Sequence, residues 1–158
     1  MSQTCQQRKW CCVSIRSLDR NSADAHGIIG FAKYIMGRGA ETEAHINEAL
    51  RFFPRDLRAF RWLLSVGFAK MQIGADAEAV DWLRRSIAAN RNLPLTHFVL
   101  AAALGLLGAL GGARAAAKAG LALDPHFTIR HLRATSSSDN PTVRRLCEGM
   151  RLAGVPEG

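Results

Sequence analysis

Histidines are the side chains of this sequence best suited to bind a metal or to transfer protons at neutral pH. No two of the five stand in an H-E-x-x-H pair or a comparable ligand spacing, and no local pattern places a cysteine beside one. We therefore predict that they are surface or packing residues and that the chain has no metal site. The five are His26, His45, His97, His126 and His131.

The four cysteines, Cys5, Cys11, Cys12 and Cys147, match no zinc-binding pattern. Cys11 and Cys12 are adjacent, and adjacent cysteines rarely form a disulfide with each other. We expect free thiols in a reducing cytoplasm. Cys147 falls on an apolar helical stripe and is predicted to be a buried thiol, not a nucleophile, whereas the pattern assigns no role to the other three.

The glycine-rich stretch GLLGALGG, residues 105–112, is the part of the chain most like a phosphate-binding loop. It lacks the Lys-Ser/Thr ending and is expected to join two helices, whereas a phosphate loop follows a strand. The acidic residues Glu41, Glu43 and Glu48 fit a solvated helix face. With no catalytic group of residues, we predict that the chain is not an enzyme and has no cofactor.

Composition favours one helical domain. The 158 residues are 48% apolar and only 7% aromatic, and Ala, Leu, Gly and Arg dominate, a mixture that suits helices better than strands. The net charge is +8, which raises the hypothesis of an acidic ligand or nucleic acid. The basic residues are scattered, however, with no run of five, so the sequence disfavours nucleic acid.

The stretch Leu93 to Leu110 has 18 residues without a charge, about the minimum for a membrane span. Thr96, His97 and two glycines weaken that interpretation, and no Trp or Tyr flanks the segment. A helix buried on most sides explains the stretch better. No apolar core follows the basic residues near the N-terminus, so we expect no signal peptide and a cytoplasmic protein.

Small residues recur at two matched intervals. Gly30, Gly67 and Ala101 are separated by 67 − 30 = 37 and 101 − 67 = 34 residues. A second series, Ala49, Ser86 and Gly120, has the same separations, because 86 − 49 = 37 and 120 − 86 = 34. The tetrapeptide GFAK also recurs at residues 30–33 and 67–70. This periodicity predicts three repeated units.

Each unit is predicted to be two antiparallel helices joined by a glycine-containing turn. Small residues would let the helices approach, with Gly67 facing Ser86 and Ala101 facing Gly120. Ile46, Leu83 and Ala117, one turn earlier, should fill the cores of the hairpins. We expect helix pairs at 22–36 and 40–52, at 58–73 and 75–90, and at 94–110 and 113–123, with Gly111-Gly112 as the last turn.

Asp124-Pro125 closes the last unit, and Pro54 closes the first at a matching position, where the second has Arg91. These residues resemble the tetratricopeptide repeat family, whose units have about 34 residues, small residues at the helix crossing and a closing proline. The resemblance implies an all-α fold, in which stacked hairpins form a short right-handed solenoid. The sequence departs from the family at Lys33 and Lys70, where Tyr is usual.

Longer stretches are similar to the C-terminal repeat region of bacterial class III adenylate/guanylate cyclases. They are AHINEALRFFPRD, EAVDWLRRSIAANRNLPLTHFVLAAALGLLG and LDPHFTIRHLRATSSSDNPT. This resemblance implies a regulatory or docking module, and it adds the alternative that the chain is a fragment of such a cyclase without its catalytic domain. It implies no catalysis in this chain.

The chain is thus predicted to have an irregular segment at 1–18, which is the remnant of an earlier repeat, three helix pairs at 19–125, and a linker with a capping helix at 126–158. In the last part, Asn140 or Asp139 and Pro141 form a helix start. Val143, Leu146, Cys147 and Met150 follow as one apolar stripe. A helix with one polar face is what the end of an array requires.

In the tetratricopeptide family the first helices line the concave face, so the remaining candidate site is a groove. This surface would bind an apolar or amphipathic helix of a protein partner, or a second copy of the chain. The alternative is that its residues pack on neighbouring helices or on the helix at 141–152. The projected groove residues are Phe31, Tyr34, Arg61, Leu64, Phe68, Met71 and Phe98.

Overall fold

The computed structural model describes residues 23–52, 58–136 and 140–158, and every regular element in these ranges is a helix. The predicted segment at 1–18, residue 22 at the start of the first predicted helix and the Pro54 ending lie outside them. The helices are α2 (Ala23–Ile35), α3 (Gly39–Phe52), α4 (Ala59–Gln72), α5 (Asp76–Ala89), α6 (Pro94–Leu106), α7 (Leu110–Leu123), α8 (Ile129–Thr135) and α9 (Pro141–Leu152).

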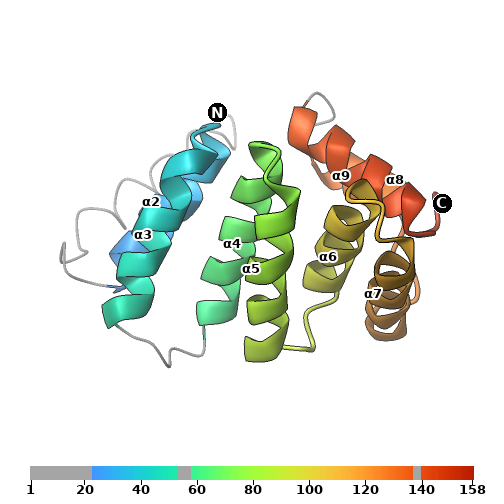
Figure 1. The fold of residues 1–158 in the computed structure, drawn as a ribbon, viewed down its shortest axis with the longest axis horizontal. Coiled ribbons are helices and arrows are strands. Elements are labelled where there is room, and N and C mark those ends of the chain that lie inside the picture. Colours follow the sequence, from blue (N-terminus) through green and yellow to red (C-terminus); the bar gives the residue numbers. More distant parts are fainter. Residues whose placement is uncertain (1–22, 53–57, 137–139) are drawn as a thin grey trace, which may run out of the picture.

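Three hairpins stand side by side in chain order, and α9 crosses the end of the third (Figure 1). Each first helix packs on the second helix of its own pair: α2 on α3, α4 on α5 and α6 on α7. Successive pairs then meet because α4 contacts both helices of the first pair and α6 contacts both of the second. This confirms the predicted fold class of stacked helix hairpins.

A left-handed glycine ends each first helix. Gly37, Gly74 and Gly108 have φ of 78°, 80° and 75°, and they repeat at the same intervals as the small residues. After Gly37, for example, the amide of Arg38 donates to the carbonyl oxygen of Lys33 at 2.8 Å, which caps the free end of the helix. Glycine adopts this conformation without the steric cost of a side chain.

The third turn corrects the predicted boundary. The turn is Leu107 to Ala109, and Gly111-Gly112 belong to the first turn of α7. The glycine that could adopt a positive φ one residue beyond the helix end was Gly108, and the Gly-Gly pair drew the prediction too far along the chain. This turn divides the uncharged stretch at 93–110, and no helix among the described residues is long and apolar enough to span a membrane.

Glycines bring the two helices of each hairpin close together. A Cβ on Gly67 would lie 2.6 Å from Cδ2 of Leu83, and one on Gly30 would lie 2.8 Å from Cδ1 of Ile46. Gly67 therefore receives Leu83 and not Ser86, whose hydroxyl instead donates to the carbonyl oxygen of Phe60 at 2.7 Å. The expected facing pair was one helical turn too late.

In the third hairpin the glycine lies on the second helix and the large side chain lies on the first. The atoms nearest a Cβ on Gly120 belong to the ring of Phe98, the first at 2.8 Å. Gly120 thus leaves room for an aromatic ring of α6, where a crossing with Ala101 was expected. Ile46, Leu83 and Ala117 are all buried, as predicted for residues that fill the hairpin cores.

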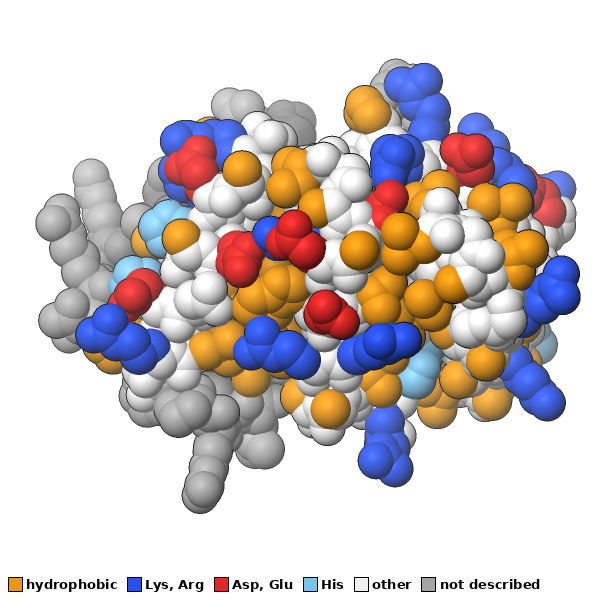
Figure 2. Space-filling view, viewed as in Figure 1, with side chains coloured by type: hydrophobic (Ala, Val, Ile, Leu, Met, Phe, Trp, Pro, Cys, Tyr) orange, Lys and Arg blue, Asp and Glu red, His pale blue; other side chains and the backbone are white. Residues whose placement is uncertain are grey.

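Lys33 and Lys70 bridge the two helices of the first and second hairpins. Lys33 pairs with Glu41 at 2.8 Å, and Lys70 pairs with Glu78 at 2.5 Å, eight residues further along in both units. Lys70 also reaches Glu43 of the preceding hairpin at 2.6 Å, and the hydrogen bonds that it donates, first to Glu43 and then to Glu78, raise the pKa of Lys70. Acidic and basic side chains are correspondingly interspersed over the face shown in Figure 2.

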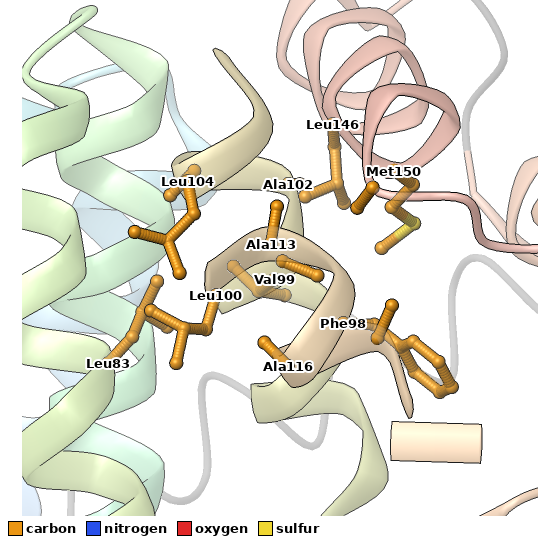
Figure 3. Close-up of a cluster of buried hydrophobic side chains, with 14 of the residues drawn as sticks. Leu83, Phe98, Val99, Leu100, Ala102, Leu104, Ala113, Ala116, Leu146 and Met150 are labelled. Carbon is orange, nitrogen blue, oxygen red and sulfur yellow. The ribbon is translucent and has the colours of Figure 1, made fainter. Parts of the chain in front are cut away.

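One apolar core joins the second and third hairpins to α9. Figure 3 shows side chains from α5, α6, α7 and α9 converging in it, among them Leu83, Phe98 and Met150, all fully buried. Helix α9 begins where predicted, because the side chain of Asn140 accepts a hydrogen bond from the amide of Thr142 at 2.9 Å. Leu146, Cys147 and Met150 of its stripe are buried.

Helix α9 approaches α6 through backbone contact. A Cβ on Gly149 would lie 2.3 Å from the carbonyl oxygen of Ala102, and one on Gly105 would lie 2.5 Å from the carbonyl oxygen of Gly149. The side chain of Arg145 also pairs with Asp76, at the start of α5, at 2.6 Å. The capping helix is thus held to the second and third hairpins by close packing and by one ion pair.

Helix α8 was not expected within the segment predicted as a linker. Thr128 begins it, since its hydroxyl accepts a hydrogen bond from the amide of His131 at 3.2 Å. The amides of Ile129 and Arg130 donate to the carbonyl oxygens of Pro156 and Glu157, so the end of the chain closes on α8. The capping threonine was visible in the sequence, but a helix of seven residues has too short a pattern to detect.

Replacing Gly149 with alanine should destabilise the protein by about 1–3 kcal/mol, because the new Cβ meets backbone that cannot rotate away. Urea unfolding followed by far-ultraviolet circular dichroism measures the change. Gly111→Ala is the matched control, because a Cβ there meets nothing within 4 Å, and it should be neutral or stabilising by up to about 1 kcal/mol. Equal stability of the two variants would contradict the close approach of α9.

Replacing Lys70 with methionine keeps the aliphatic stem but leaves Glu43 and Glu78 without their shared cation. We expect a loss of about 1 kcal/mol, or about 2–4 °C in Tm, and a smaller difference from the parent protein at high salt. Thermal unfolding tests this. Lys118→Met, which changes an exposed lysine of α7, should shift the free energy of unfolding by no more than about 0.5 kcal/mol.

Candidate functional site

A groove of about 790 Å³ lies between α2, α4 and the start of α6. It is formed by the first helices of the three hairpins, the elements that the sequence projected as its walls. The lining residues are Asp24, Gly27, Ile28, Phe31 and Tyr34 from α2, Arg58, Phe60, Arg61, Trp62, Leu64, Ser65 and Phe68 at or within α4, and Leu93 and Leu95 at the start of α6.

Three aromatic side chains form one continuous wall. The rings of Tyr34 and Phe68 are stacked, with centroids 5.7 Å apart and planes inclined by 23°. Phe31 continues the row at 6.1 Å from Tyr34, and its side chain is 49% exposed. The side-chain amide of Gln72 donates to the carbonyl oxygen of Tyr34 at 3.2 Å, which ties α2 to the end of α4.

The glycine at position 27 lets α4 approach α2 beneath the groove. A Cβ there would lie 2.3 Å from Nε1 of Trp62, so the indole occupies the space of the missing side chain. Trp62 and Leu64 are both only 8% exposed and belong to the walls as well as to the core. The groove therefore has a rigid base of packed side chains.

The charges in the groove lie at the end where α2 and α4 begin. Asp24 pairs with Arg58 at 3.0 Å, and each largely neutralises the other. Arg61 is exposed, and no ion pair joins its guanidinium to another described residue. Its carbonyl oxygen accepts a hydrogen bond from the hydroxyl of Ser65 at 2.9 Å, which satisfies that hydroxyl within the helix.

Five of the seven projected residues line this groove: Phe31, Tyr34, Arg61, Leu64 and Phe68. Met71 and Phe98 do not, and both are fully buried. Phe98 turns toward Gly120 and stacks on Phe127, with ring centroids 3.8 Å apart. Met71 belongs to the core that α9 completes. Helical spacing alone could not predict that Phe98 and Met71 are buried, because the segments that cover them lie far along the chain.

Sequence reasoning missed the acidic residue of the groove and much of its apolar lining. Asp24, Arg61 and Leu95 share one position of the repeat, since 61 − 24 = 37 and 95 − 61 = 34. The intervals that relate the small residues could therefore have placed Asp24 and Leu95 in the groove together with Arg61. Leu93 precedes the first turn of α6, where Pro94 stands, and was assigned to a connecting turn. Nothing in the local pattern marked Phe60 or Trp62 as wall residues.

Titratable side chains outside the groove form no reactive group among the described residues. The rings of His26 and His45 lie 6.0 Å apart, and burial, followed by repulsion from His26, lowers the pKa of His45. Burial raises the pKa of the Cys147 thiol, which keeps it protonated and unreactive. No three His, Cys, Asp or Glu side chains of the described ranges gather closely enough to hold a metal. The groove is the candidate site.

No protein-family model matches the chain, and no curated protein matches it in sequence. Among solved structures it is similar to the type III secretion chaperone SycD of Yersinia enterocolitica, in complex with a peptide of the translocator YopD. The TM-score is 0.61 at 16% identity, over 83% of this chain and 93% of that chain. At this identity the likeness concerns the fold, which is a tetratricopeptide-like array of helices.

Tyr34, the single tyrosine of the chain, reports on the groove directly. Burial disfavours the phenolate and raises its pKa above 10.0, the ordinary value. The folded protein should therefore lose stability as the pH rises above about 10, because the unfolded chain releases this proton first. Near-ultraviolet absorption of the phenolate follows the titration, and Phe68→Ala should bring it back toward the ordinary value. A Tyr34 that titrates normally in the parent protein would contradict the packed aromatic wall.

Proposed function

We propose that this protein is a non-catalytic interaction module, and that its groove binds an apolar helical segment of another protein. The observation that carries the proposal is an open groove of about 790 Å³ with aromatic walls and few charges. A folded protein that keeps large apolar side chains in contact with water at one hollow commonly uses them to bind a partner.

The groove offers apolar surface that a partner can remove from water. Phe31 is 49% exposed and Ile28 is 40% exposed, and both line the groove. Covering apolar surface is worth roughly 25 cal/mol per Å², so a few partner side chains at helical spacing supply the main attraction. The rigid base under Trp62 limits the ordering that the groove itself must undergo on binding.

The likeness to SycD supports a peptide-like partner. That chaperone has the same fold and is in complex with a peptide of a translocator. In this chain Phe31, Tyr34 and Phe68 form one wall of the groove on which such a partner would lie. Asp24 is the single carboxylate among the lining residues, and the Ser65 hydroxyl is hydrogen-bonded within its own helix, which fits binding without catalysis.

Two alternatives have less support. Self-association through the same aromatic residues would use the same groove and is distinguished by the oligomeric state. A regulatory role beside a cyclase domain rests on the resemblance of three stretches of sequence alone, and no family model or curated protein that matches the chain adds to it. We therefore put binding to a separate protein first.

An amphipathic peptide of about four helical turns, with leucines on one face, tests the proposal. Phe31→Glu should weaken binding about tenfold or more, because a charge replaces the most exposed ring of the wall. Fluorescence anisotropy of the labelled peptide measures the affinity. Ile73→Glu is the control, because Ile73 is equally exposed at 48% but does not line the groove.

Circular dichroism should show the same fold for both variants. Equal affinity of the two variants, or no binding to the parent protein, would refute the proposal. A dimer on size-exclusion chromatography that dissociates in Phe31→Glu would instead identify the groove as a contact between two copies of the chain.

A further inference from the structure

In the third hairpin another helix covers the surface that forms the open groove in the first two hairpins. Phe31 and Phe68 correspond to Ala102, and Tyr34 and Met71 correspond to Gly105, because the same intervals of 37 and 34 residues separate them. Helix α9 lies against α6 (Figure 1). Its Gly149 approaches the backbone of α6 at Ala102 and at Gly105 and covers the surface there. An amphipathic helix of this chain therefore occupies the third position and covers Met71 of the second, whereas Phe31, Tyr34 and Phe68 line the open groove.

Charge is one of the features that hold α9 in its position. Helix α9 carries Arg144, Arg145 and Arg151 against the single acidic residue Glu148. Arg145 pairs at 2.6 Å with Asp76, whose side chain is only 12% exposed. The filled position thus combines an apolar stripe with a cation that meets a carboxylate of the array.

The open groove carries a positive charge, whereas the array presents the carboxylate of Asp76 to α9 at the filled position. Among its lining residues the charged side chains are Asp24, Arg58 and Arg61, and the first two neutralise each other at 3.0 Å. Arg61 is exposed at the end of the groove, with no ion pair to another described residue. The groove therefore presents one uncompensated positive charge beside an aromatic wall.

From this juxtaposition, and resting on the proposed function, we infer that the partner is an acidic amphipathic helix. Its apolar stripe lies along Phe31 and Phe68, and a carboxylate at the edge of the stripe pairs with Arg61. The net charge of +8 attracts such a helix over a longer range. The same charges repel a basic helix, so α9 of a second copy is a poor occupant of the groove.

Three peptides with the same leucine stripe test this inference. They differ only in the residues that flank the stripe, which are Glu, Gln or Lys. At low ionic strength the parent protein should bind the Glu peptide about tenfold more tightly than the Lys peptide, and salt should reduce the difference. Arg61→Glu should reverse the order of the Glu and Lys peptides.

Arg114→Glu is the matched control, because it reverses an exposed arginine of α7 and changes the net charge by the same amount. This variant should retain the preference for the Glu peptide. If Arg61→Glu leaves the order unchanged, or if Arg114→Glu reverses it equally, Arg61 does not determine the preference and the inference fails.

The peptides also separate this inference from the proposed function. Equal binding of all three, abolished by Phe31→Glu, would refute the acidic partner and leave the groove as a site for apolar helices. If none of the three binds, the proposed function and the inference fail together.

Discussion

The fold depends on close contact between helices at positions where one of them has no side chain. Gly30 and Gly67 receive Ile46 and Leu83 within the hairpins, and Gly27 receives Trp62 between them. Because a helix pair can bury little apolar surface by itself, each of these contacts also lets the next pair stack. The missing side chains of these glycines thus set the distance between neighbouring helices, and with it the depth of the groove.

One surface of this array serves two purposes through a change of residue size. In the first two units it carries Phe31, Tyr34 and Phe68, which line the open groove, and Met71, which is buried. In the third unit it carries Ala102 and Gly105, and α9 lies directly on the backbone there. A closed end that stabilises the stack and an open groove therefore arise from the same repeat without any change of topology.

Ion pairs join the two helices in the first and second hairpins. Lys33 and Lys70 each meet a glutamate eight residues later, and the third unit replaces this bridge with Leu104 packed on Gly112. The polar bridges occur where the array is more exposed to solvent, and the apolar one occurs within the core that α9 closes. Local burial explains which of the two chemistries each unit uses.

The repeat, the three hairpins, the capping helix and five of the fourteen residues that line the groove were predictable from the sequence, because helical periodicity and small-residue spacing are local properties. Tertiary structure decided the remainder. Gly67 receives Leu83 and not Ser86, Phe98 is covered by Phe127, and Met71 joins the core completed by α9. Which face of a helix stays open depends on segments far away in the chain, and no local pattern contains that information.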